Sequence, residues 1–371
     1  MANEVSGGEI FSTTVAPITD EHHRNDHAQI FPLKNGDLLL VWSEYYVRSP
    51  SIMGRHPYEE GLSRDDAPCQ ITGRISADGG RTWSGRLTVQ ENIGRNNVKQ
   101  PNLLRLQSGD VLFFFTMWDI AKQERAVYWK RSADDCESWS KPVQFTQPGG
   151  SYILDAGRVL IHSSGRIILP IYWAPELWTD KDKLEAFCYY SDDGGDTWKE
   201  SSNRMHLPGR GAMEPTIAER RDGSLMVLLR STLGRLFEAE SIDRGETWCE
   251  PKESALIAPQ SEPCLKRVPS TGDLIVIWNR TLPYALTETD SKVTHHPRNP
   301  LTAAISKDDG ANWVNYRNIE DRKMYSSAYP NLFFNENEAL VTYYHCPEAT
   351  RGVASLELKI FEVDWFYADS E

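Results

Sequence analysis

The sequence predicts an all-β fold, a six-bladed β-propeller, from two repeats and their spacing. A motif with Ser, Asp and Trp at fixed positions, and with Gly in four of its copies, occurs five times, and its tryptophans follow one another at intervals of 56, 59, 50 and 65 residues. A second repeat, a turn followed by an apolar run, alternates with the first. Units of roughly 50 residues with four short strands each are typical of propeller blades.

The first repeat is clearest in the segment from Ser76 through Asp78 and Gly80 to Trp83. Each copy stands between two short apolar runs, which predicts a hairpin turn. In such a turn the Asp accepts hydrogen bonds from backbone amides and the Gly adopts a positive φ. The Trp is expected to pack between neighbouring sheets, so we interpret these residues as structural rather than catalytic. The other copies end at Trp139, Trp198, Trp248 and Trp313.

The second repeat predicts a further hairpin in every unit. Its turns begin at Asn35, Ser108, Ser164, Asp222, Thr271 and, in a looser form, Asn335. This gives six units, five of which carry the first motif. The apolar run at residues 8–15 belongs to no unit, and we expect it to complete the last blade and close the ring. Residues 1–371 then form a single propeller domain.

Two long segments without a strand pattern, residues 44–69 and 281–297, interrupt this rhythm. Both lie between the second and third strands of their units, so we expect them on the same face of the ring. Irregular loops on one rim of a rigid scaffold commonly carry the binding site. A third such loop contains residues 180–187, for which the pattern predicts a short helical turn.

The net charge of −13 argues against a nucleic-acid-binding surface. No apolar run approaches the length of a membrane span, so no membrane association is expected. The start of the chain lacks the pattern of a secretory signal, which predicts a cytoplasmic location, although a trimmed secreted chain would read the same. The histidines show no zinc-binding spacing, so no metal is expected. The oligomeric state has no signature in the sequence.

Aligning the units on their turns places one polar residue just before each inner strand. These residues are His27, Gln100, Asp155, Glu214, Glu262 and Tyr329. Equivalent positions in a ring of blades converge on the axis at one end. The register therefore predicts a concave site lined by six side chains, rather than six unrelated residues that bond to water or strand ends.

The repeats resemble the Asp boxes, or BNR repeats, of the sialidase (neuraminidase) superfamily, and the resemblance covers nearly the whole chain. The segment from Glu214 to Arg230, the segment at Arg298 and the segment at Tyr329 are similar to the catalytic segments of that superfamily. Near the first inner strand this chain has Arg24 followed by Asn-Asp-His-Ala, where sialidases usually have an Arg-Ile-Pro element. In this respect the chain looks more like the divergent branch of predicted neuraminidases.

The resemblance implies roles for particular residues. Tyr329 would be the nucleophile and Glu214 the base that takes its proton. Asp66 or Asp65, at the end of the first long loop, would be the general acid. Three arginines would hold a substrate carboxylate: Arg24, Arg230 and Arg298. The remaining substrate contacts would be Asp26, His27, Gln100, Asp155, Glu262 and Tyr344.

The chemistry of these residue types agrees with the implied roles. A tyrosine hydroxyl, with a pKa near ~10, needs a neighbouring carboxylate to become a nucleophile at neutral pH. A neutral nucleophile suits a sugar whose anomeric carbon carries a carboxylate, because an anion would be repelled. Guanidinium groups stay charged and bind carboxylates through paired hydrogen bonds. We therefore expect an exo-glycosidase that acts on a terminal acidic sugar, sialic-acid-like or uronic, without a cofactor.

Two other functions fit the same residues. His27 and Tyr329 could act as base and acid in a polysaccharide lyase, whose product carries a double bond that absorbs ultraviolet light. The ring could instead bind glycans without catalysis, and it would then release no product.

Overall fold

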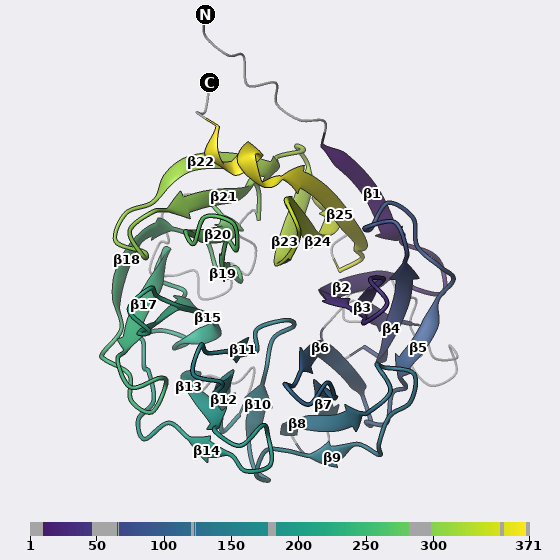
Figure 1. Ribbon diagram of the computed structural model, residues 1–371, viewed down its shortest axis with the longest axis horizontal. Helices are drawn as coiled ribbons and strands as arrows, with labels where there is room; N and C mark the ends of the chain where they lie inside the picture. Colours follow the sequence, from purple (N-terminus) through teal and green to yellow (C-terminus); the bar gives the residue numbers. More distant parts are fainter. Residues whose placement is uncertain are drawn as a thin grey trace, which may run out of the picture.

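The computed structural model describes residues 10–46, 65, 67–119, 122, 124–176, 183–281, 298–348 and 352–368. In these ranges the protein is almost entirely β, with strands β1 to β25 and a 3-10 helix, η3 (Val363–Tyr367). The sheets are arranged around a common centre (Figure 1). No helix in the described ranges has the length and apolar character that crossing a membrane requires.

The first three units form one continuous sheet, because single parallel pairings join them: Cys69 with Asn97, and Arg125 with Ser151. The first unit contains β2 (Arg24–Pro32), β3 (Leu38–Tyr45), β4 (Cys69–Ser76) and β5 (Leu87–Gln90). The second contains β6 (Asn97–Arg105), β7 (Val111–Asp119), β8 (Glu124–Ser132) and β9 (Val143–Gln144). The third contains β10 (Ser151–Ile153), β11 (Leu160–Ile161), β12 (Ile167–Ala174), β13 (Glu185–Ser191) and β14 (Lys199–Glu200).

The other three units are separate four-stranded sheets. The fourth contains β15 (Met213–Glu219), β16 (Leu225–Arg230), β17 (Arg235–Ser241) and β18 (Lys252–Ile257). The fifth contains β19 (Cys264–Arg267), β20 (Leu274–Asn279), β21 (Leu301–Ser306) and β22 (Val314–Glu320). The last contains β23 (Tyr325–Asn335), β24 (Glu338–Pro347), β25 (Ser355–Glu362) and β1 (Phe11–Ala16).

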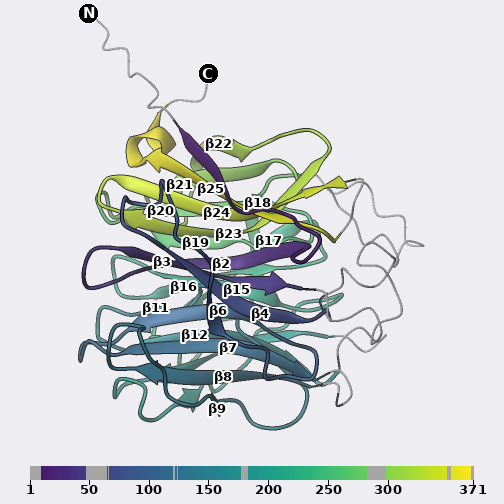
Figure 2. The same ribbon diagram turned by 90° about the vertical axis from the view of Figure 1, so that its right-hand side faces the viewer.

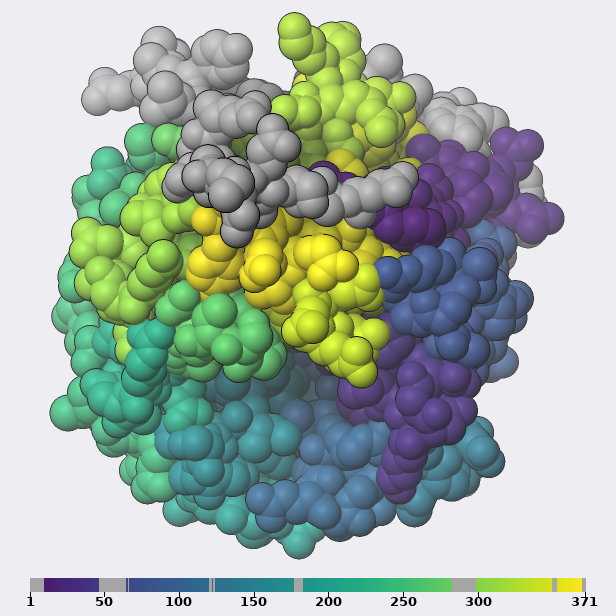
Figure 3. Space-filling view, turned by 45° about the horizontal axis from the view of Figure 1, so that its top comes forward, coloured from purple at the N-terminus to yellow at the C-terminus, as the bar shows by residue number. Residues whose placement is uncertain are grey.

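The first strand of the chain joins the last sheet. β1 pairs antiparallel with β25, from Phe11 opposite Ile360 to Ala16 opposite Leu356, and Figure 1 shows the purple strand beside the yellow one. The opening apolar run therefore completes the last unit, as expected. Figure 3 shows the yellow C-terminal residues between green residues of the preceding unit and purple residues from near the N-terminus. Phe366 of η3 is buried there in a core shared with β20 and β21.

The hydrophobic core is divided among the spaces between neighbouring sheets. Leu40 of β3 packs with Leu340 of β24 and Leu358 of β25, so the first and last units share a core. Five further clusters fill the other spaces around the ring, which Figure 2 shows from the side. Trp83 packs against the first of these cores, and Trp248 is buried between the third and fourth units. The repeated tryptophans thus pack between sheets, as the sequence predicts.

The Asp/Trp turns are closed by their own side chains. Asp78 Oδ1 accepts hydrogen bonds from the backbone amides of Arg81, at 3.0 Å, and Thr82, at 2.8 Å. Ser76 Oγ accepts one from the amide of Gly80, at 2.8 Å. The hydrogen bonds from Thr82 lower the pKa of Asp78 to about 2. The corresponding Asp accepts the same backbone bond in the other four copies, which supports a structural role for the motif.

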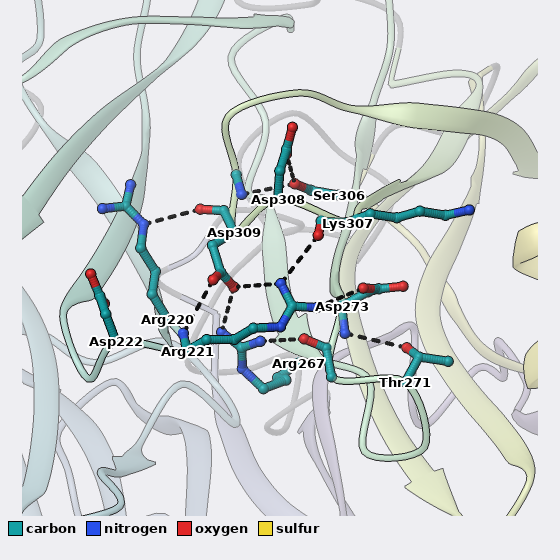
Figure 4. Close-up of polar contacts among 12 residues, drawn as sticks. Arg220, Arg221, Asp222, Arg267, Thr271, Asp273, Ser306, Lys307, Asp308 and Asp309 are labelled. Carbon is teal, nitrogen blue, oxygen red and sulfur yellow. Dashed lines mark hydrogen bonds and ion pairs between the residues drawn. The ribbon is translucent and has the colours of Figure 1, made fainter.

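Ion pairs join neighbouring units on the face that carries these turns. Arg221, in the turn after β15, and Arg267 of β19 both contact Asp309 Oδ1, at 3.4 and 3.0 Å (Figure 4). Arg221 also contacts Asp273, at 2.8 Å. Because Arg221 is largely exposed, these pairs contribute little stability each, but they fix the fourth unit against the fifth.

Strand direction separates this face from the opposite one. Strands β3 and β20 end, and β4 and β21 begin, at the end of the ring where the inner strands begin. The long segments between them lie mostly outside the described residues. The predicted site residues also lie at that end. One expectation is wrong: residues 185–187 are not helical, because β13 begins at Glu185 and pairs with β12.

Candidate active site

Four inner strands contain a β-bulge at the same place. The pairing register shifts between Asp26 and Gln29, between Lys99 and Asn102, between Met213 and Thr216, and between Ala328 and Asn331. At each shift one residue other than glycine has a positive φ: His27 (47°), Gln100 (62°), Glu214 (45°) and Tyr329 (52°). Such a conformation is costly, and bulges beside active sites redirect side chains. Four of the six predicted site positions therefore share one backbone distortion.

Tyr329 is held by aromatic and cationic neighbours. Its ring stacks on His27 with centroids 4.0 Å apart, and the ring of Tyr344 meets it edge-on at 5.1 Å. The guanidinium carbon of Arg298 lies 5.2 Å from the centre of its ring. Burial raises the pKa of Tyr329 well above its ordinary value, although Arg298 and Arg230 act in the opposite direction. The hydroxyl is therefore protonated at neutral pH and needs a base to react as a nucleophile.

Glu214 and Arg230 form a buried ion pair beside Tyr329. Arg230 Nη1 donates a hydrogen bond to Glu214 Oε1. Glu214 Oε2 and Arg230 Nε are buried without a hydrogen-bond partner among the described residues. In the described part of the chain, Glu214 does not hydrogen-bond Tyr329. The two side chains nevertheless interact electrostatically. Buried polar atoms without partners indicate a place where a ligand binds.

The first unit contributes a second charged group. Arg24 Nε lies 2.5 Å from Asp26 Oδ2, and Arg24 Nη2 lies 3.1 Å from Asp65 Oδ1. Asp26 is fully buried, and its other oxygen contacts His27 Nδ1 at 2.7 Å, so it orients its neighbours. Burial alone would raise the pKa of Asp65, but Lys99 and Arg24 outweigh it and hold that pKa well below its ordinary value.

Asp65 is therefore ionised at neutral pH, with 37% of its side chain exposed. In the ligand-free chain it holds no proton to donate. Asp66, the other candidate for the acid, lies outside the described residues.

Arg298 is positioned by the fifth and last units. Its Nη1 donates a hydrogen bond to the hydroxyl of Tyr344, at 3.0 Å, and its Nη2 donates one to the carbonyl of Gln260, at 3.2 Å. Interaction with the two tyrosines, Tyr344 and Tyr329, raises the pKa of Arg298 despite the opposing effect of burial. The guanidinium therefore remains charged beside the proposed nucleophile.

The other predicted residues lie deeper. Gln100 Nε2 donates a hydrogen bond to Asp155 Oδ1, and Arg158 Nη2 donates one to Glu262 Oε1, at 2.6 Å. Gln100, Asp155 and Glu262 are at most 3% exposed. One ligand atom each of His27, Asp155 and Glu262 lies within 4.8 Å of the others, although the histidine spacing gave no reason to expect a metal.

Burial raises the pKa of both deep carboxyl groups. The pKa of Asp155 lies well above its ordinary value, first because of burial and then because of Glu262 and Glu214. Burial raises the pKa of Glu262 to about 7, although Arg158 opposes this shift. The deep part of the site thus contains more carboxylate than its cations balance.

Two residues of the site were missed by the sequence reasoning. Arg158 bonds Glu262 and the carbonyl of Pro330, and Lys99 lies 3.8 Å from Asp65 while only 2% exposed. Lys99 immediately precedes Gln100, so its place beside a predicted site position was a usable signal. Arg158 has no repeat counterpart to identify it.

A cavity of about 530 Å³ lies between the third, fourth and fifth units, and Arg158 lines it. It is lined by residues such as Ser163, Ala218, Arg220 and Lys266, which are nearer the turn face. None of the predicted site residues lines it. We therefore place the candidate active site at the bulges and not in this cavity.

Comparison with known proteins finds similarity to sialidases over parts of the chain. An anhydrosialidase of Macrobdella decora is 38% identical over 90 residues, which are 24% of this chain and 10% of that protein. A sialidase of Paraclostridium sordellii is 24% identical over 242 residues, which are 56% of this chain and 58% of that protein. The matched part of the chain thus spans about a tenth of the length of the anhydrosialidase and somewhat over half the length of the sialidase.

The solved structure described as Hadza microbial sialidase Hz136 superimposes with a TM-score of 0.72. The match covers 95% of this chain and 69% of that one at 18% identity, which shows the shared fold. The family model for the BNR repeat-like domain matches residues 58–346. The chain therefore belongs to the BNR repeat-like domain family, within the sialidase superfamily.

Proposed function

We propose that this protein is an exo-glycosidase of sialidase type, which hydrolyses the bond to a terminal acidic sugar of a glycan. The observation that supports this most is the meeting of Tyr329, Glu214 and Arg298 with a second arginine, Arg230, at one end of the ring. In this proposal the six units form a closed six-bladed propeller in one domain, and the carbohydrate enters from the end of the ring where the inner strands begin.

Tyr329 acts as the nucleophile. Its hydroxyl oxygen attacks the anomeric carbon while its proton passes to Glu214, whose Oε2 has no other hydrogen-bond partner among the described residues. The bond from the anomeric carbon to the leaving oxygen breaks as an acid protonates that oxygen. Water then hydrolyses the tyrosyl sugar, so the product forms with retained configuration.

Asp65 or Asp66 supplies the proton to the leaving oxygen. Asp65 is ionised in the ligand-free chain because of Lys99 and Arg24, so it serves only if the sugar draws these cations away. The variants Asp65→Asn and Asp66→Asn distinguish the two candidates. Loss of the true proton donor should slow hydrolysis of substrates with poor leaving groups more than hydrolysis of substrates with good ones.

The arginines bind the sugar carboxylate. Arg230 retains a buried Nε without a partner among the described residues, and Arg298 is held with its charge next to Tyr329. Arg24 would give up its hydrogen bond to Asp65 and would bind the substrate carboxylate instead. A carboxylate bound by such groups lies beside the anomeric carbon, which explains a preference for acidic sugars.

The lyase alternative has one observation in its favour, the stacking of His27 on Tyr329. A base and an acid in contact could remove a proton next to a uronic acid carboxylate and protonate the leaving oxygen. The carboxylate would bind the same arginines.

A substrate screen separates these functions. Purified protein is incubated with chromogenic sialosides and glucuronides, and reducing ends and ultraviolet absorbance are followed in parallel. We expect release of chromophore without new ultraviolet absorbance from a double bond. New absorbance would identify a lyase. Saturable binding of glycans with no product would leave only a binding function.

A further inference from the structure

Three side chains from different units bring potential metal ligands together in the candidate site. His27 is in β2, Asp155 follows β10 and Glu262 precedes β19, and each is at most 5% exposed. One ligand atom from each lies within 4.8 Å of the others. We propose that His27, Asp155 and Glu262 bind a divalent transition-metal ion, Mn²⁺ or Zn²⁺. This inference does not rest on the proposed glycosidase activity.

The histidine is already oriented as a metal ligand. Its Nδ1 lies 2.7 Å from Asp26 Oδ1, and the other oxygen of Asp26 accepts a hydrogen bond from Arg24 Nε, at 2.5 Å. The proton of a neutral imidazole therefore lies on Nδ1, and the lone pair lies on Nε2. No described residue hydrogen-bonds Nε2. A carboxylate behind a histidine in this way fixes the tautomer and the ring direction in metal sites.

In each of the two carboxylates, one oxygen accepts a hydrogen bond and the other oxygen has no partner within the described ranges. Gln100 donates to Oδ1 of Asp155, and Arg158 donates to Oε1 of Glu262. The other two oxygens, Asp155 Oδ2 and Glu262 Oε2, are buried and have no hydrogen-bond partner among the described residues. Burying an unpaired carboxylate oxygen is costly, so these atoms are expected to meet a ligand, a water molecule or a proton.

The ligand set favours a particular class of ion. Imidazole suits zinc and other transition metals, whereas carboxylates are also accepted by Mn²⁺, so a mixed set excludes a preference for Ca²⁺ or Mg²⁺. Ligands at about 2.1 Å from one ion lie up to about 4.2 Å apart, so small side-chain rotations close the trio around it. Three protein ligands leave further coordination positions open to water or a sugar oxygen.

Protonation of the two carboxylates is the alternative to metal binding. If Asp155 and Glu262 are simply protonated, the site binds no ion. The experiment therefore measures binding directly. Protein treated with a chelator and dialysed is titrated with MnCl₂ or ZnCl₂ in a calorimeter, and the metal retained after gel filtration is quantified.

We expect one equivalent of Mn²⁺ or Zn²⁺ per chain and a rise in the melting temperature on binding. Asp155→Asn and His27→Gln should each weaken binding at least 100-fold. Glutamine is a suitable replacement at position 27, because Gln100 adopts the same positive φ at the equivalent bulge. Asp26→Asn, which weakens the contact that orients His27 and also the ion pair with Arg24, should weaken binding by about 10- to 100-fold.

A matched control removes a histidine elsewhere. His206 is 59% exposed and lies 3.6 Å from Glu185, a surface pair that metals bind adventitiously. His206→Gln should leave the stoichiometry and affinity unchanged. Circular dichroism and gel filtration confirm that each variant is folded.

Three outcomes overturn the proposal. They are no retained metal in the wild-type protein, equal binding by wild type and Asp155→Asn, and tighter binding of Ca²⁺ than of Mn²⁺ or Zn²⁺. The last would contradict a nitrogen ligand. Metal binding without hydrolysis of any sugar would remove the proposed function and leave this inference intact, and hydrolysis without metal binding would do the reverse.

Discussion

His27 and Tyr329 stack with their ring centroids 4.0 Å apart, although one lies in the first unit and the other in the last. Both occupy bulges with positive φ, on inner strands that the ring brings together. The stacking holds the ring of Tyr329 while its hydroxyl stays among charged groups. The packing of Tyr329 therefore depends on its ring and its proposed reactivity on its hydroxyl group. A variant that removes only the hydroxyl group can separate the two.

Tyr329→Phe should lower kcat by about 10²- to 10⁴-fold on an acidic glycoside and change the melting temperature little. The reason is that the variant loses the hydroxyl and keeps the stacked ring. The measurements are steady-state kinetics and thermal melting. Tyr343→Phe is the control: its ring is 1% exposed and its hydroxyl bonds Glu320 at 3.0 Å, away from the site. If both variants retain full activity, Tyr329 is not the nucleophile.

Arg298→Lys should raise KM for acidic sugars by roughly 10- to 100-fold, because a charged hydrogen bond to the carboxylate contributes about 1.5–3 kcal/mol and lysine lacks the fork. An amide analogue of the substrate should show little change. Kinetics on the matched acid and amide substrates measure the difference. Arg280→Lys is the control, because Arg280 stacks on Tyr316 outside the site. An equal rise in KM for the amide would contradict a carboxylate contact.

The sequence was sufficient to predict the repeated units, but it did not predict the backbone geometry of the site. Repeats with a constant order of Ser, Asp and Trp define hairpins directly, and the polar positions before the inner strands followed from the same register. The positive φ at His27, Gln100 and Tyr329 had no sequence signal, because glycine is the residue expected in that conformation. The contact of Arg158 with Glu262 depends on two units meeting across the ring, which no local pattern encodes.

The local helical pattern failed at Glu185 for a related reason. Pairing of β13 with β12 over seven residues outweighed a weak helical preference. The identity of the general acid also could not be read from the sequence, because Lys99 and Arg24 decide the charge of Asp65 and both lie far from it in the chain.

Trp248→Ala should lower the free energy of unfolding by about 3–5 kcal/mol. Trp248 is 4% exposed in the core between the third and fourth units, so its removal leaves a cavity in an interface between sheets. Chemical denaturation measures the loss. Ile242→Ala, in the same turn but 82% exposed, should change stability by at most about 0.5 kcal/mol. Equal effects of the two variants would mean that the tryptophan does not join the sheets.

His345 should make the protein less stable in acid. Its Nδ1 lies 2.8 Å from Ser327 Oγ and its Nε2 accepts from Arg322 at 3.1 Å, which fits the neutral ring. Burial lowers the pKa of His345 to about 4, below its ordinary value of 6.5. Between these two values the unfolded chain binds the proton that the folded chain excludes, so stability falls as the pH falls.

The shift predicts a loss of about 2 kcal/mol from this residue between pH 7 and pH 5. Because other groups also titrate, the measurement is the difference between the wild-type protein and His345→Gln in urea unfolding at both pH values. Glutamine can still bond Ser327 and Arg322 but carries no titratable group, so the variant should lose less stability on acidification. An identical pH dependence for both proteins would show that His345 takes up its proton as readily when folded as when unfolded.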